Sequence, residues 1–279
     1  MGILPWVVGL FPALRSAWMR PAPEGFHARR FLLAWCVVVF AFFSASSSKL
    51  VAYILPLFPA LALLIGDYLR GASRRVLLAQ AAIAGLVGVA LIVAAPQAPA
   101  YASDAIPPSL LESYVPWLTA SGIVLAAAGA LGVAFLSRGL QTPAVLALAC
   151  GGLAFAQTAL TGHETLSPSL SAYHIVRKVR DQVKPDTPFY AVETFDHTLL
   201  FYLGRNVTMV YVTDELADPI ARAPRDFLPD AAAFARAWEA DREAFAVFNI
   251  NDLPGFLKEH PMPMRIVGVD PRRVIVRKP

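Results

Sequence analysis

Residues 42–64, FFSASSSKLVAYILPLFPALALL, contain a single lysine between two long apolar runs. A bilayer core needs roughly 20 apolar residues in a helix to cross it, and about 17 as a lower limit. The two runs therefore predict neighbouring membrane helices joined by a short polar turn. Lys49 would lie at the edge of the bilayer, either as a helix-end anchor that reaches water or as a ligand for a phosphate.

The rest of the chain has the same apolar character. Of its 279 residues 57% are hydrophobic and 16% charged, and the mean hydropathy is +0.54, which excludes an ordinary soluble protein. We predict an α-helical integral membrane bundle of about six transmembrane helices within residues 1–162. The predicted segments are residues 3–18, 31–46, 51–69, 76–95, 117–136 and 143–160.

Two of these segments are rich in small residues. They read AAIAGLVGVA over residues 81–90 and SGIVLAAAGALGVA over residues 121–134. Small side chains allow helix backbones to approach closely in a membrane, so we expect these two helices to pack together.

Basic residues follow a pattern that predicts the orientation. The loops 19–30, 70–75 and 137–142 contain arginine, and they alternate with the connections 47–50 and 96–116 and the exit after residue 161. The positive-inside rule places the arginine-rich loops in the cytoplasm and residues 163–279 outside. Because the excess of base lies in short loops between apolar runs, we expect no nucleic-acid partner.

The apolar periodicity ends near residue 162. Residues 163–279 alternate predicted helices with short strands, which indicates a small α/β domain ending in a hairpin. Asp196 is a predicted N-cap of the helix DHTLLFYLG, Gly204 its end, and Asp230 lies at the start of a second helix. The segment RRVIVRK (residues 272–278) is predicted to be an edge strand, because its charges would discourage further pairing.

The stretch quoted above also resembles a known family. FFS, a short polar turn and KL..YILPLFPALALL are similar to the corresponding stretch of bacterial polyprenyl-phosphate-dependent glycosyltransferases of the GT-C architecture. These are the lipid A 4-amino-4-deoxy-L-arabinose transferases and their protein O-mannosyltransferase relatives. Further similarity lies in FYLGRNVTMV with DEL after it, in LPDAAAFARAWEA and in FAVF. Val51 and Ala52 stand where the family commonly has Pro-Thr.

This resemblance implies a multi-pass enzyme of the bacterial inner membrane whose C-terminal domain is periplasmic. Such enzymes move a sugar from a polyprenyl-phosphate donor to a lipid A, protein or glycan acceptor, with the lipid phosphate as leaving group. A cation near that phosphate would stabilise the charge that develops on it. Lys49 matches the family lysine and becomes the first candidate for the lipid-phosphate site, and Tyr53 is the second.

The resemblance assigns no catalytic residue to this chain. Family members have their catalytic acid in the first outer loop of a much longer chain, so we expect a C-terminal portion that is inactive alone. Glu24 and Asp67 fall on the predicted cytoplasmic side, where Asp67 is expected to pair with Arg70, and Asp104 and Glu112 lie in a different outer loop. The histidines lack metal-ligand spacing, so no metal site and no cofactor is predicted, and a requirement for a divalent metal stays open.

Two other classes of function compete with this interpretation. A non-catalytic inner-membrane protein that displays its periplasmic α/β domain to a partner has the same composition. A transporter is less favoured, because no ionisable residue lies in the middle of a predicted helix.

Overall fold

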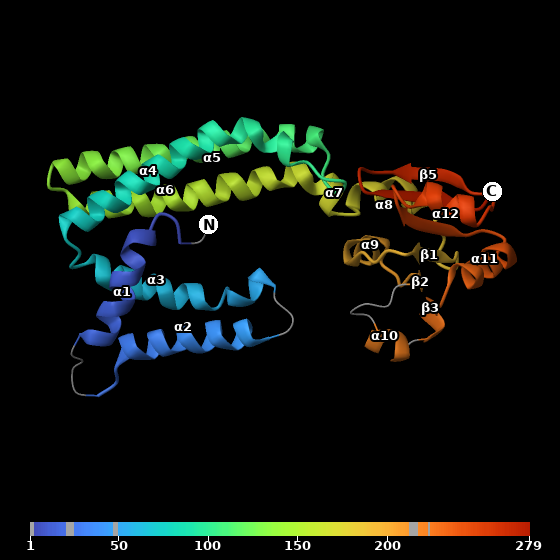
Figure 1. The fold of residues 1–279 in the computed structure, drawn as a ribbon, viewed down its shortest axis with the longest axis horizontal. Helices are drawn as coiled ribbons and strands as arrows, with labels where there is room; N and C mark the ends of the chain where they lie inside the picture. The colour runs from blue at the N-terminus through green and yellow to red at the C-terminus, as the bar shows by residue number, and fades with distance from the viewer. Residues whose placement is uncertain (1–2, 21–24, 47–49, 212–216, 223) are drawn as a thin grey trace. The chain divides into compact units, whose positions relative to one another are not determined.

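The computed structural model describes residues 3–20, 25–46, 50–211, 217–222 and 224–279 (Figure 1). The chain divides into two compact units. The helical unit comprises residues 1–96 and 115–162, and the C-terminal unit comprises residues 97–114 and 163–279. The segment 97–114, which the sequence-based division at residue 162 had included in the membrane part, therefore groups with the C-terminal unit.

The helical unit is built from six apolar helices and a short 3₁₀ turn in the described residues. These elements are α1 (Val7–Met19), α2 (Ala28–Ala45), η1 (Val51–Ile54), α3 (Leu57–Leu69), α4 (Arg74–Ala94), α5 (Pro108–Ser137) and α6 (Gln141–Gly162). Helix α5 begins in the segment assigned to the C-terminal unit. The predicted helical membrane bundle is confirmed.

Four helical stretches are long and apolar enough to cross a membrane, by length and composition. They are Ala28–Ala45, Arg74–Tyr101, Pro108–Ser137 and Gln141–Leu170, whereas Val7–Met19 and Leu57–Leu69 are shorter apolar helices. The third predicted segment is split, because Pro56 and Pro59 allow a helix to start but lack the N–H groups that would continue it from residue 51.

Helices α4 and α5 contact each other through glycine. A Cβ atom added at Gly88 would collide with the backbone of Gly122 and Ala126, and one added at Gly129 would collide with the backbone of Gly85. The small residues in segments 81–90 and 121–134 therefore let α4 and α5 pack backbone against backbone, as the sequence predicts.

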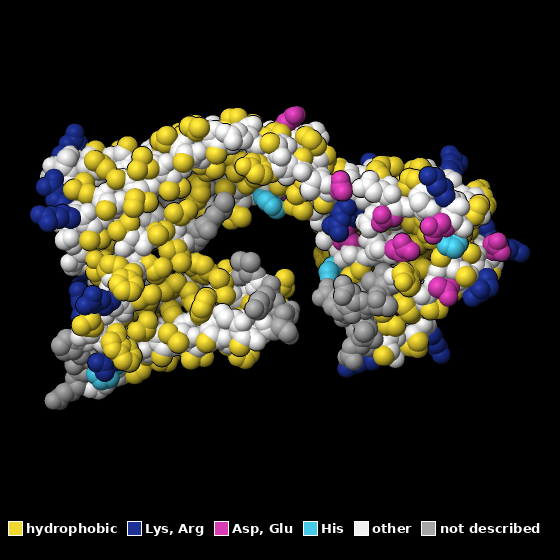
Figure 2. Space-filling model, viewed as in Figure 1, with side chains coloured by type: hydrophobic (Ala, Val, Ile, Leu, Met, Phe, Trp, Pro, Cys, Tyr) yellow, Lys and Arg dark blue, Asp and Glu magenta, His cyan; other side chains and the backbone are white. Residues whose placement is uncertain are grey.

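The charges of the helical unit gather at one end. Figure 2 shows Lys and Arg side chains at the end where α1 meets α2, α3 meets α4 and α5 meets α6, and a mainly hydrophobic surface over the rest of the visible face. The three predicted arginine-rich loops thus share one end of this unit, as an alternating membrane topology requires.

The C-terminal unit is a mixed α/β domain. Its helices are η2 (Ala95–Tyr101, whose first two residues belong to the helical unit), η3 (His163–Leu166), α7 (Ser167–Leu170), α8 (Tyr173–Val179), η4 (Arg180–Gln182), α9 (His197–Leu203), α10 (Ala217–Arg222), η5 (Pro224–Asp226), α11 (Ala231–Ala240) and α12 (Leu253–Glu259). Its strands are β1 (Phe189–Val192), β2 (Thr208–Val210), β3 (Phe227–Leu228), β4 (Phe245–Asn249), β5 (Arg265–Val269) and β6 (Arg273–Arg277).

The strands form one sheet in the order β3-β2-β1-β4-β6-β5. Pairing is parallel from β3 through β4, and β6 is antiparallel to both β4 and β5. The two faces hold separate cores, one with Phe234 and Trp238 of α11, the other with Ile175 and Val179 of α8. Asp196 and Asp230 are the N-caps of α9 and α11, where each side chain accepts a backbone N–H, and Gly204 ends α9 at φ 66°.

One strand prediction is wrong. The segment RRVIVRK contains β6, which lies inside the sheet between β4 and β5. Val274, Ile275 and Val276 are buried, so the apolar centre of the segment is covered on both faces. The flanking charges are accommodated because Arg273 and Arg277 both pair with carboxylates.

Candidate functional site

The candidate lipid-phosphate site lies at the connection between α2 and α3. Lys49, the first candidate, lies outside the described residues, as does the DEL segment at 214–216. Tyr53 is described and lies on the 3₁₀ turn η1, where its backbone N–H donates to the Leu50 carbonyl at 3.0 Å. Residues Val51–Ile54 therefore form a tight turn directly ahead of α3.

Packing orients the Tyr53 ring. It stacks on Phe43 near the end of α2, with the ring centroids 5.3 Å apart and the planes at 30°. The residue as a whole is 36% exposed, so the ring is held on one face while Tyr53 remains accessible. Stacking of this kind stabilises an aromatic pair beyond its area burial and fixes the ring plane.

The start of α3 is also fixed against α2. The Trp35 indole N–H donates to the Pro56 carbonyl at 3.0 Å, and the Cys36 thiol lies 3.9 Å from the Leu57 carbonyl oxygen. These contacts attach the turn to a rigid helix. An accessible phenol can donate a hydrogen bond to a phosphate oxygen, and this is the chemistry that Tyr53 offers.

The structure identifies no general base among the acids of the predicted outer loop. Asp104 and Glu112 are exposed and belong to the C-terminal unit. Among the described residues there is also no cluster of three His, Cys, Asp or Glu side chains that could hold a metal ion. We therefore assign neither a catalytic residue nor a metal ligand.

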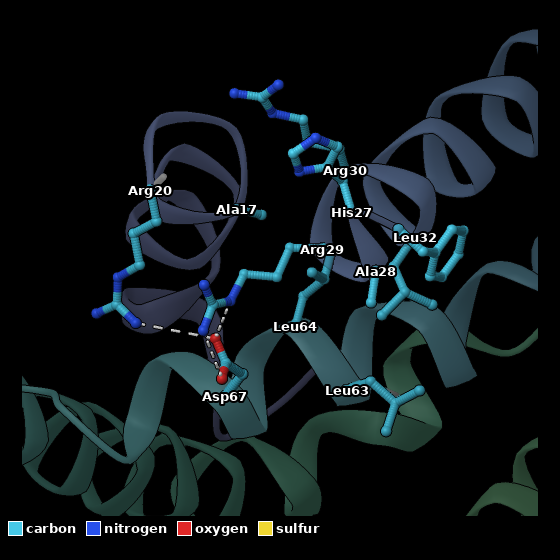
Figure 3. A pocket seen from close by; sticks show the side chains of 11 residues that line it. Ala17, Arg20, His27, Ala28, Arg29, Arg30, Leu32, Leu63, Leu64 and Asp67 are labelled. Carbon is cyan, nitrogen blue, oxygen red and sulfur yellow. Dashed lines mark hydrogen bonds and ion pairs between the residues drawn. The ribbon is translucent and has the colours of Figure 1, made fainter. Parts of the chain in front are cut away.

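Asp67 has different partners from those predicted. Instead of pairing with Arg70, it accepts from the Arg29 Nε at 2.8 Å and Nη2 at 3.3 Å, and the Arg20 Nη1 lies 3.8 Å away (Figure 3). Arg20 follows the end of α1 and Arg29 lies in the first turn of α2, and both reach Asp67 in the last turn of α3. A contact between helices thus replaces the predicted pair with Arg70. The carboxylate in an apolar helix indicated that Asp67 has a charged partner, but the sequence could not identify it because Arg29 is 38 residues away.

Comparison with known proteins covers both units. A family model described as the aminoarabinose transferase C-terminal domain matches residues 175–278. An undecaprenyl phosphate-alpha-4-amino-4-deoxy-L-arabinose arabinosyl transferase of Proteus mirabilis is 41% identical over 98 residues, which are 34% of this chain and 17% of that protein. A transferase of the same description from Pseudomonas fluorescens is 38% identical over 120 residues, 40% of this chain and 21% of that protein.

Solved structures extend the similarity over nearly the whole chain. ArnT from Cupriavidus metallidurans in the apo state is 32% identical, with a TM-score of 0.85, and the match covers 98% of this chain and 50% of that one. The same protein bound to undecaprenyl phosphate gives the same TM-score and identity. The chain thus spans about half the length of this solved relative.

The resemblance predicted from the sequence is confirmed. This chain is similar, in sequence and in fold, to the C-terminal portion of bacterial aminoarabinose transferases. Its apolar helices and this similarity together identify a membrane protein.

Proposed function

We propose that this chain is the C-terminal part of a membrane glycosyltransferase that moves a sugar from a polyprenyl-phosphate donor to an acceptor. The observation that supports it best is the similarity over 98% of the chain to a protein whose structure was solved with undecaprenyl phosphate bound. By that similarity, the donor proposed here is an undecaprenyl-phosphate-linked aminoarabinose and the acceptor is lipid A.

The connection between α2 and α3 (residues 46–56), called the α2–α3 turn below, is the proposed contact with the lipid phosphate. When the glycosidic bond breaks, negative charge accumulates on the departing phosphate, and a cation held close to it lowers the barrier. We assign this role to Lys49 and the role of a hydrogen-bond donor to Tyr53, whose ring is already oriented by Phe43. A flexible ammonium suits a phosphate that arrives and leaves in each turnover.

The orientation follows from the arginines. We propose that the arginine end of the helical unit lies in the cytoplasm, which puts the α2–α3 turn and the C-terminal unit on the periplasmic side of the inner membrane. Sugar transfer would then take place on that side, where the C-terminal unit contributes to acceptor binding or to the stability of the bundle.

The test is a chimera in which this chain replaces the C-terminal half of the Cupriavidus metallidurans relative. Membranes containing the chimera are supplied with the labelled undecaprenyl-phosphate sugar and lipid A, and the release of undecaprenyl phosphate is followed. We expect turnover, with kcat reduced about a hundredfold by Lys49→Ala, because one charge-stabilising donor is lost, and about tenfold by Tyr53→Phe.

Lys258→Ala is the matched control, since Lys258 is an exposed lysine on α12, and it should leave turnover unchanged. Direct binding of undecaprenyl phosphate to the purified chain is measured in parallel, so that a chimera that fails to assemble does not decide the question. Two results together would favour the non-catalytic interaction domain instead: the purified chain does not bind undecaprenyl phosphate, and the chimera reaches the membrane but shows no turnover.

A further inference from the structure

A pocket lies at the arginine end of the helical unit, away from the α2–α3 turn. It has a volume of about 350 Å³ and opens between the end of α1, the start of α2 and the end of α3 (Figure 3). That volume is at the lower end of the range for small-molecule sites. No step of the proposed sugar transfer uses this pocket.

The lining has a charged part and an apolar part. Arg20, Arg29 and Arg30 provide three guanidinium groups, and Asp67 provides the one carboxylate among the lining residues. The apolar part is formed by Ala17, Phe26, Ala28, Leu32, Leu63 and Leu64. A ligand with a charged head group joined to a hydrocarbon chain would match these two parts of the lining.

The positive charge of the lining exceeds its negative charge. Asp67 accepts two hydrogen bonds from Arg29 and is 3.8 Å from Arg20, so one carboxylate is shared by two cations. Figure 3 shows Arg30 extending away from this group, and its guanidinium lies 5.8 Å from the centre of the Trp18 ring. Three cations against one anion leave an excess of two positive charges in the lining.

Arginines that only determine membrane orientation do not require such geometry, because any position in the loop satisfies the positive-inside rule. Here Asp67 fixes Arg29 across 38 residues of sequence, and Trp18 supports Arg30. The first turn of α2, which begins ARRF, contains no acidic residue, so basic side chains surround the positive end of the helix dipole and increase its attraction for an anion.

We propose that this pocket binds the phosphate of an anionic membrane phospholipid, with Arg20 and Arg30 on the head group and Leu32, Leu63 and Leu64 along the start of its acyl chains. Planar guanidinium groups bind phosphate oxygens in pairs of hydrogen bonds, and basic pockets between membrane helices bind anionic head groups. The site is independent of the proposed transferase activity.

The experiment measures lipid retention on the purified full chain. The protein is delipidated in detergent, titrated with phosphatidylglycerol or with phosphatidylcholine of the same acyl chains, and examined by native mass spectrometry. We expect one phosphatidylglycerol to be retained in preference to phosphatidylcholine. Arg30→Gln should weaken that retention about tenfold, as should Arg20→Gln.

Arg75→Gln is the matched control, because Arg75 is an exposed arginine at the start of α4, at the same end of the unit, and it does not line the pocket. Equal losses in Arg30→Gln and Arg75→Gln would overturn the proposal, since they would show a general surface potential without a site. Equal retention of the two lipids would also overturn it.

A third arm distinguishes a lipid from a free anion. Inorganic phosphate at millimolar concentration should displace little of the retained phosphatidylglycerol, because it lacks the acyl chains that contact the leucines. Binding of inorganic phosphate by a chain that retains no phosphatidylglycerol would overturn the assignment to a phospholipid. None of these measurements depends on sugar transfer, so their outcome is separate from that of the chimera.

Discussion

Arg273 is a buried cation at which three segments of the C-terminal unit meet. Only 3% of its surface is exposed. Its Nε donates to Asp196 at 2.6 Å, its Nη1 donates to Asp270 at 2.9 Å, and Nη1 and Nη2 reach the carbonyls of Ser171 and Ser169, both at 3.3 Å. One side chain thus connects β6, the N-cap of α9 and the chain entering α8.

Removal of this cation should be costly. Arg273→Met leaves the buried Asp270 and the partly buried Asp196 without their cation, and breaking a buried pair from one side costs about 3–5 kcal/mol. We expect faster hydrogen exchange in β4 and β6 of the full chain, measured by mass spectrometry in detergent. Arg265→Met is the control, because Arg265 is exposed on β5. Similar exchange in the two variants would contradict this account.

Asp196 makes the stability of the same unit depend on pH. Burial raises the pKa of Asp196, but the hydrogen bonds from Thr198 and the charge of Arg273 outweigh it and leave the pKa below its ordinary value. A carboxyl whose pKa is lower in the folded state stabilises that state above its unfolded pKa of about 3.9, and the contribution is lost as the pH falls through the folded pKa.

We therefore expect the C-terminal unit to lose stability as the pH is lowered below about 4. The measurement is hydrogen exchange of β6, corrected for the intrinsic rate at each pH. Asp196→Asn should be less stable at neutral pH and should show a flatter dependence in the acid range. An unchanged slope in this variant would show that other carboxyls dominate.

At the scale of elements, the contact between α4 and α5 depends on the absence of side chains. Gly88→Ala or Gly129→Ala would push a methyl group into the backbone of the facing helix. Overpacking of this kind costs about 1–3 kcal/mol. We expect a lower melting temperature for either variant of the detergent-solubilised chain, followed by fluorescence-detected size exclusion.

Gly66→Ala provides the control for this pair. Gly66 lies in α3, and a Cβ atom added there would meet no atom within 4 Å. Because alanine favours a helix over glycine by about 1 kcal/mol, this variant should melt at the same temperature or higher. If all three variants melted alike, close backbone approach would not explain the glycines of α4 and α5.

The elements also show what the sequence could predict. Apolar runs predicted the membrane helices, because a helix in lipid makes all of its backbone hydrogen bonds within itself. The N-caps Asp196 and Asp230 were predictable because each bonds to a backbone N–H only a few residues away. Strand order and long-range pairing were not predictable. β6 is internal because the chain turns back after β5 and places β6 between β5 and β4. Asp67 pairs with Arg29 and not with Arg70 because of how three helices pack.

The same division between local and distant information applies to the candidate site. The KL..YILP stretch identified Tyr53 by resemblance, but its stacking on Phe43 joins residues ten positions apart across a turn. The pocket of Arg20, Arg29 and Arg30 was not predicted as a site, because each arginine alone is explained by orientation. What distinguishes the two explanations is the convergence of Arg20 and Arg29 on Asp67, together with the apolar part of the lining.

At the scale of the whole molecule, the arginine-rich loops and the number of membrane crossings together predict which side of the membrane each part of the chain faces. Between Ser73 and Glu259 the chain contains α4, α5 and α6, all long and apolar enough to span a bilayer. An odd number of crossings places these two residues on opposite sides of the membrane. Arginine-rich loops resist translocation, so the side with Ser73 should be the cytoplasm.

Cysteine labelling tests this topology. Cys36 and Cys150 are free and are replaced by alanine, after which Ser73→Cys and Glu259→Cys are introduced separately at exposed positions. A membrane-impermeant maleimide should label the Glu259→Cys variant in intact spheroplasts, and the Ser73→Cys variant only after permeabilisation. The reverse pattern would place the α2–α3 turn in the cytoplasm and remove the basis for periplasmic sugar transfer. Labelling of both in intact cells would mean that one of the three helices does not cross, because two sites on the same side require an even number of crossings.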